Sequence, residues 1–179
     1  MKLLQIIIST FVFLAQVTIA SASPVPLCKD GSRMFNHEVS SLISRNAPQY
    51  RLHELEHYGK SKDNKYDCYY TYLGAIEHAA VIIYFDDEKI YAKKIKVKWL
   101  RNDQSAAIAA SHAMTAIQVA LDIQRPELII LGNRMKESNG SGAVWCPNLR
   151  KTFIAWIAPS PEDARYNTFT IVADDREIM

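Results

Sequence analysis

The stretch from residue 94 to residue 99 alternates lysines with apolar side chains, the pattern of a β-strand with one buried and one solvated face. The apolar face carries Ile95, Val97 and Trp99, and the other face carries Lys94, Lys96 and Lys98. The β-branched and aromatic run Ala79–Phe85 comes before this strand, and the acidic residues Asp86–Glu88 separate the two. We therefore predict a hairpin in a sheet that has one covered face and one face in water.

The other predicted elements fit around this sheet. Apolar residues spaced for one helix face predict an N-terminal helix over Phe35–Ile43, and an Ala-rich run predicts a long buried helix over Gln104–Ile123. A shorter helix is predicted from Pro48 to Tyr58, with Gly59 ending it. Further strands are predicted at Cys68–Leu73, Glu127–Leu131, Gly142–Cys146, Thr152–Ala158 and Asn167–Ala173. This order indicates an α+β domain in which an N-terminal helix and one long inserted helix pack on a largely antiparallel sheet.

The first residues have the features of a secretory signal peptide. Lys2 precedes the apolar stretch Leu3–Ala20, small residues follow, and Pro24 stops any continuing helix. We predict a signal peptide over residues 1–22, cleaved after Ala22, and a single secreted α+β domain over residues 23–179. No membrane span is expected after the signal is removed. The mature chain is close to electrically neutral, so its overall charge does not steer it toward nucleic acid.

Three cysteines enter an oxidising compartment if the chain is secreted: Cys28, Cys68 and Cys146. One disulfide and one free thiol are expected, and the spacing leaves the pairing open. The sequence Asn139-Gly140-Ser141 is an N-glycosylation sequon in a turn-like segment. It is either a glycan acceptor at Asn139 or an ordinary surface turn.

The segment His53-Glu54-Leu55-Glu56-His57 matches the HExxH pattern of zinc peptidases. On a helix, His53 and His57 would share a face and could hold zinc, while Glu54 would activate the metal-bound water. Glu77 is the candidate third ligand. Against this hypothesis, Glu56 places a charge inside the motif and Glu77 falls just before a predicted strand. The alternative is a short surface helix with solvated side chains.

The lysines on the wet face of the strand are the second candidate site. Lys94, Lys96 and Lys98, with Trp99 beside them, could follow a phosphate backbone or contact another partner. The competing interpretation is a solvated strand face, or a charged edge that prevents strands of different molecules from pairing.

The layout of the chain resembles that of small secreted fungal proteins with the microbial guanyl-specific ribonuclease fold, in particular the ribonuclease-like effectors of powdery mildew fungi. The segments that carry the resemblance are Cys28, the helix Phe35–Ile43, Ala47–Tyr50, the lysine-rich strand up to Trp99, Pro126–Asn133 and Gly142–Cys146. They span most of the chain. The resemblance implies a ribonuclease-like α+β scaffold and a role in virulence.

Active members of that family use a His, a Glu, an Arg and a second His to move protons and hold the phosphate. The corresponding positions fall near Gln49, within Lys94–Lys98, near Pro126-Glu127 and near Cys146, and none of the four residue types is matched. The chain also departs from the family by its long helix over Gln104–Ile123 and by the lack of a C-terminal cysteine. The resemblance therefore implies a scaffold without catalytic residues.

Our leading hypothesis is a secreted effector that acts by binding a host protein or RNA, with translocation into a host cell as one possible destination, and without enzymatic activity or a cofactor. The first alternative is a secreted zinc metallopeptidase built on His53, Glu54, His57 and Glu77. The second is a structural or carbohydrate-binding secreted domain, which the tyrosines of Cys68–Tyr72 suggest.

Overall fold

The structure is a computed structural model that describes residues 25–27, 32–86 and 91–176, with only the backbone described for residues 32–36 and 77. The predicted signal peptide, residues 1–22, and Cys28 lie outside the described residues. Within them, no helix is both long enough and apolar enough to cross a membrane.

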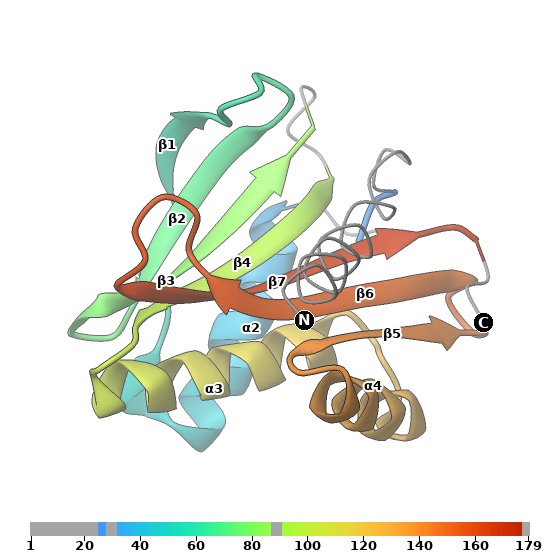
Figure 1. Cartoon of the computed structure of the whole chain (residues 1–179). Helices are drawn as coiled ribbons and strands as arrows, with labels where there is room; N and C mark the ends of the chain where they lie inside the picture. Colours follow the sequence, from blue (N-terminus) through green and yellow to red (C-terminus); the bar gives the residue numbers. More distant parts are fainter. Residues whose placement is uncertain (1–24, 28–31, 87–90, 177–179) are drawn as a thin grey trace, which may run out of the picture.

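The described strands form one sheet of seven in the order β1-β2-β3-β4-β7-β6-β5, with every neighbouring pair antiparallel. Two meanders build it, and they join where β4 pairs with β7 (Figure 1). The first contains β1 (Glu56–Lys60), β2 (Asp67–Leu73), β3 (Ile76–Phe85) and β4 (Ala92–Leu100). The second contains β5 (Ser141–Cys146), β6 (Lys151–Pro159) and β7 (Tyr166–Asp174). The predicted α+β class with a largely antiparallel sheet is confirmed.

The helices α2 (Ser32–Asn46), α3 (Gln104–Ala120) and α4 (Arg125–Glu137) cover one face of this sheet, as Figure 1 shows. The predicted N-terminal and Ala-rich helices correspond to α2 and α3. The carboxylate of Asp103 begins α3 by accepting a hydrogen bond from Ala106 N at 3.0 Å. Small side chains let α3 lie close to the sheet, since Ala106, Ala109, Ala110 and Ala113 are all fully buried. The other sheet face carries the lysines of β4.

The third helix, α4, is where a strand was predicted at Glu127–Leu131, and that prediction is wrong. The residues that face the core are spaced as on one side of a helix. Leu131 is buried, and Leu128 and Met135 pack against the core. The two isoleucines that suggested a strand, Ile129 and Ile130, are 56% and 44% exposed. Pro126 lies in the first turn, where its missing N–H costs nothing. The helix approaches β5 closely at Gly142, which has no side chain. A Cβ at this position would lie only 3.0 Å from Met135 Cγ.

The predicted helix from Pro48 to Tyr58 is also wrong. Only Pro48–Tyr50 forms a short 3-10 turn, η1, and the chain then runs extended into β1, a strand that was not predicted. Two hydrogen bonds from the β2–β3 hairpin hold it there: Gly74 N donates to Arg51 O at 2.8 Å, and Thr71 Oγ1 donates to His53 O at 2.9 Å. Gly59 does not end a helix; it lies at a bulge of β1 with φ of 112°. Pairing with β2 therefore overrides the local helix signals.

Candidate ligand-binding groove

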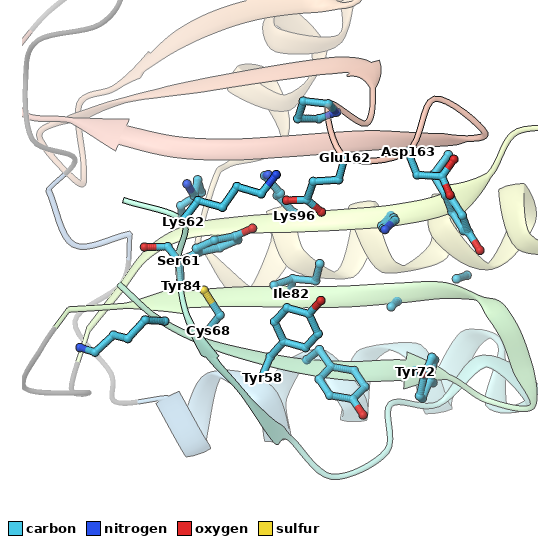
Figure 2. Close-up of a pocket in the computed structure, with 18 of the residues that line it drawn as sticks. Tyr58, Ser61, Lys62, Cys68, Tyr72, Ile82, Tyr84, Lys96, Glu162 and Asp163 are labelled. Carbon is cyan, nitrogen blue, oxygen red and sulfur yellow. The ribbon is translucent and has the colours of Figure 1, made fainter. Parts of the chain in front are cut away.

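A groove of about 950 Å³ lies on the sheet face that the helices leave open. Its floor is formed by β2, β3 and β4. One wall comes from β1 and the β1–β2 turn, and the opposite wall comes from the β6–β7 turn; Figure 2 shows the lining side chains between these walls. The residues used below are Tyr58, Cys68, Tyr70, Tyr72, Ile82, Tyr84, Lys94, Lys96, Lys98, Glu162, Asp163, Arg165 and Tyr166.

Lys94, Lys96 and Lys98 form a row along the centre of the groove. Alternate residues of a strand point to the same face, so neighbouring lysines start about 7 Å apart along β4. Aromatic rings support each amine: Lys94 Nζ lies 4.1 Å from the ring centroid of Tyr84, and Lys98 Nζ lies 4.6 Å from that of Tyr166. Lys96 Nζ is 5.4 Å from the Tyr84 centroid. These cation–π contacts hold the amines in an ordered row over the sheet.

Three tyrosines beside the β1–β2 edge form a ladder of rings. Tyr58 and Tyr70 meet edge to face with centroids 5.8 Å apart, and Tyr70 and Tyr72 do so at 5.4 Å. Tyr58 is 73% exposed and Tyr72 is 42% exposed, so both offer ring surface to a ligand. The Tyr70 hydroxyl donates to Glu56 Oε2 at 2.6 Å, and this bond raises the pKa of Tyr70 to about 12. The ladder is thus fixed in position but open to stacking.

The opposite wall is an acidic turn between β6 and β7. The turn is closed by Ser160 N donating to Tyr166 O at 2.8 Å and by Tyr166 N donating to Asp163 O at 3.0 Å. Arg165 binds the Asp163 carboxylate through two nitrogens and lowers the pKa of Asp163 to about 2. Figure 2 shows Glu162 pointing from this turn into the groove toward Lys96. The groove therefore has a cationic centre with an aromatic wall on one side and an acidic wall on the other.

The floor of the groove is partly withdrawn from water. Burial lowers the pKa of Lys94, and the neighbouring Lys96 lowers it further, while Glu162 acts in the opposite direction. Burial also raises the pKa of Tyr84 and of the Cys68 thiol, so both stay protonated at neutral pH. An anion that entered the groove would meet ammonium groups in a less polar setting than bulk water, where their attraction is stronger.

The structure brings three of the four predicted partner-binding residues together and separates the fourth. Lys94, Lys96 and Lys98 share the groove, but Trp99 is 8% exposed and packs in the core under the opposite sheet face. Its inclusion in a binding site is therefore wrong, because odd-numbered residues of β4 point toward the helices. Sequence reasoning missed Tyr58 and Glu162 as groove residues. Neither belongs to a motif, and only the sheet order and the β6–β7 turn bring them beside the lysines.

The HExxH segment does not have the geometry that its zinc interpretation needs. His53 and His57 do not share a helix face, because His53 lies in a segment without regular secondary structure and His57 lies on strand β1. His53 Nε2 is 2.7 Å from Gly74 O, and His57 Nε2 is 3.3 Å from Asp67 Oδ1. The Glu54 side chain is exposed, and the side chain of Glu77 lies outside the described part of the structure. Among the described residues, no group of three His, Cys, Asp or Glu side chains could hold a metal ion.

The remaining predicted positions are dispersed over the fold. Cys68 and Cys146 are free thiols, and five interstrand spacings, about 24 Å, separate their strands. A disulfide between them is therefore not formed, and any pairing with Cys28 lies outside the described residues. Asn139 is exposed in the turn between α4 and β5.

The positions that correspond to ribonuclease catalytic residues are not gathered at one site either. Gln49 contacts the β2–β3 turn, Glu127 lies in the first turn of α4, and Cys146 is buried on β5 beneath that helix. Of the four corresponding positions, only the segment Lys94–Lys98 lines the groove.

Comparisons with protein-family models, with curated proteins and with solved structures found no significant match. The function is therefore inferred from the groove itself.

Proposed function

We propose that this chain is a secreted, non-enzymatic binding protein of the effector type, and that it holds single-stranded RNA in the groove on the open sheet face. The observation that carries the proposal is the parallel arrangement of three lysines and a tyrosine ladder on one solvated face. The N-terminal leader in the sequence supports secretion. The sequence resemblance is the support for a ribonuclease-like scaffold, and the helix-covered antiparallel sheet agrees with it at the level of the α+β class.

Single-stranded nucleic acid fits this arrangement better than a duplex does. An extended strand presents phosphates at regular intervals along one side and unpaired bases along the other. The lysines repeat about every 7 Å along β4 and can each meet one phosphate. The exposed rings of Tyr58 and Tyr72 flank that row and can each stack on a base, at about 1–3 kcal/mol per base. A rigid duplex would reach the lysines but would leave the tyrosines unused.

The test is binding of a fluorescent single-stranded RNA of about ten nucleotides, followed by anisotropy. The variant Lys94→Gln/Lys96→Gln/Lys98→Gln should abolish binding because it removes the cationic row. A control of equal charge change, Arg45→Gln/Arg125→Gln/Lys136→Gln, alters exposed residues on helices α2 and α4 and should bind as the wild type does. Equal loss of binding in both variants would mean that general charge, and not the groove, attracts RNA. No binding by the wild type would refute the proposal.

The non-catalytic half of the proposal has its own measurement. Purified protein incubated with single-stranded RNA should leave it uncut over many hours. Cleavage that a single substitution in the groove abolishes would overturn this half and leave RNA binding intact.

The tyrosine ladder also favours a second candidate, binding of a neutral carbohydrate, because sugar rings stack on exposed aromatic faces. The two functions differ in which residues they need. Carbohydrate binding should be lost in Tyr58→Ala/Tyr72→Ala and should survive in the triple lysine variant, whereas RNA binding should weaken in both. Tyr69 is not a useful target, since its ring packs on Phe85 at 5.5 Å on the core side of β2.

A further inference from the structure

The acidic wall of the groove is unexpected in a site for a polyanion. Glu162 is exposed at the β6–β7 turn and points into the groove toward Lys96 (Figure 2). Its charge acts on Lys94, a member of the lysine row, and on Tyr84, which lies on the neighbouring strand β3. Among the described residues, no hydrogen bond or ion pair to the Glu162 carboxylate is present, since only its backbone N–H is bonded, to Ser160 Oγ at 3.4 Å.

The neighbouring acid differs in this respect. Asp163 is held by Arg165, with Arg165 Nη2 donating to Asp163 Oδ2 at 2.7 Å. That pair is neutral as a whole, and its oxygens are occupied. Glu162 is therefore the acceptor on this wall whose carboxylate remains available to a ligand, and the closed turn of residues 160–166 fixes where it stands.

We infer that Glu162 selects RNA over DNA by accepting a hydrogen bond from a ribose 2′-hydroxyl, an inference that rests on the proposed function. The placement decides which part of the strand Glu162 meets. In this arrangement the sugars link the phosphates over the lysines to the bases over the tyrosines of β1 and β2. Glu162 points into the groove toward Lys96 (Figure 2), so its carboxylate meets the backbone next to the phosphates, where each 2′-oxygen neighbours the 3′-phosphate. A hydroxyl donor at this place exists only in ribose, because deoxyribose lacks the 2′-oxygen.

The charge of Glu162 makes the selection sharper than a neutral acceptor would. A carboxylate close to the phosphates repels every strand, and only a strand that offers a donor offsets the repulsion with a charge-assisted hydrogen bond. RNA is thus tolerated and DNA is penalised. The expected preference for RNA is about tenfold or more, the factor that one hydrogen bond to a charged group contributes.

The experiment compares three oligonucleotides of identical sequence: RNA, DNA and fully 2′-O-methylated RNA, which keeps the ribose shape but lacks the donor. The wild type should bind RNA about tenfold more tightly than the other two. The variant Glu162→Ala should bind DNA more tightly than the wild type does. The ratio of its RNA affinity to its DNA affinity should fall to about one. Glu162→Gln keeps an acceptor without the charge, so its preference for RNA should lie between those of the wild type and Glu162→Ala. The control Glu137→Ala, on α4, should keep the preference of the wild type.

Equal binding of the three oligonucleotides by the wild type would overturn the inference while leaving the proposed function in place. A preference for RNA that persists in Glu162→Ala would also overturn it, because another residue would then read the sugar. Absence of binding to all three would contradict the proposed function itself, and the inference would fall with it.

Discussion

The lysine row makes a quantitative prediction for the salt dependence of RNA binding. Each phosphate neutralised on a single strand releases counterions and contributes about −0.7 to the slope of log affinity against log salt concentration. The three lysines of the row along β4 therefore predict a slope of about −2. Between 50 and 200 mM salt, affinity should fall by roughly twentyfold. This magnitude follows from the number of lysines that the sheet aligns on one face.

The perturbation that tests it is Lys96→Gln, which removes the middle cation and keeps a polar, unbranched side chain one atom shorter. The slope should become about −1.4, and the loss of affinity over the same salt range should shrink to roughly sevenfold. Anisotropy titrations at four salt concentrations give the slope directly. Lys136→Gln, at the exposed end of α4, is the matched control and should keep the slope of the wild type.

A second variant separates charge from stacking. Tyr72→Ala should weaken binding by about 1–3 kcal/mol at every salt concentration, so that the lines for the wild type and the variant stay parallel. A slope that is the same in Lys96→Gln as in the wild type would refute the assignment of Lys96 to a phosphate. A slope near zero in the wild type would refute the whole row as a phosphate track.

Three predictions concern the fold and its titrating groups. Gly74→Ala should destabilise the protein by more than about 2 kcal/mol in urea unfolding, because φ is 62° there and an added Cβ would lie 1.9 Å from Gln49 O; Gly132→Ala, with nothing within 4 Å of the added Cβ, should instead stabilise it by up to about 1 kcal/mol. A hydrogen bond from Arg176 lowers the pKa of Asp174 to about 2 from 3.8. The stabilisation that this pair gives the folded protein is therefore complete above pH 4 and is lost as pH falls toward 2. Asp174→Asn should flatten that part of the curve of unfolding free energy against pH. Burial raises the pKa of Cys146 to about 11 and also raises that of Cys68. Iodoacetamide at pH 8 should therefore label both thiols slowly in the native protein and rapidly in urea, which intact-mass measurement will report. Rapid labelling of the native protein would contradict their burial.

Local sequence signals predicted the elements whose own residues determine their structure. The alternation in β4 and the small buried face of α3 are visible in single segments, and both elements were placed correctly. The segment Leu128–Leu131 is different, because four apolar residues in a row fit either a buried strand or a helix. The decision comes from outside the segment: Gly142 on β5 leaves the space in which Leu131 and Met135 pack.

The strand β1 was not predictable for a related reason. Glu56–Lys60 has no apolar alternation, and four of its five residues are exposed. It is a strand because β2 offers a free edge for pairing and because Gly59 can adopt the φ of 112° at its bulge. The zinc site predicted from the HExxH match was wrong for the same reason. Two histidines four residues apart share a face only on a helix, and this segment is not helical. A motif of side chains has chemical meaning only when the backbone between them is known.

The position of β4 in the sheet changes the meaning of the lysine row. Charged residues on a strand commonly protect an exposed edge from pairing with another molecule, and the sequence alone was compatible with that interpretation. In the structure, β4 is the fourth of seven strands and pairs on both sides, so it has no edge to protect. A plain solvated face does not account for the row either, because the lysines lie against aromatic rings and burial lowers the pKa of Lys94. Holding like charges side by side in a partly desolvated groove costs stability, and an anionic ligand that neutralises them offsets this cost.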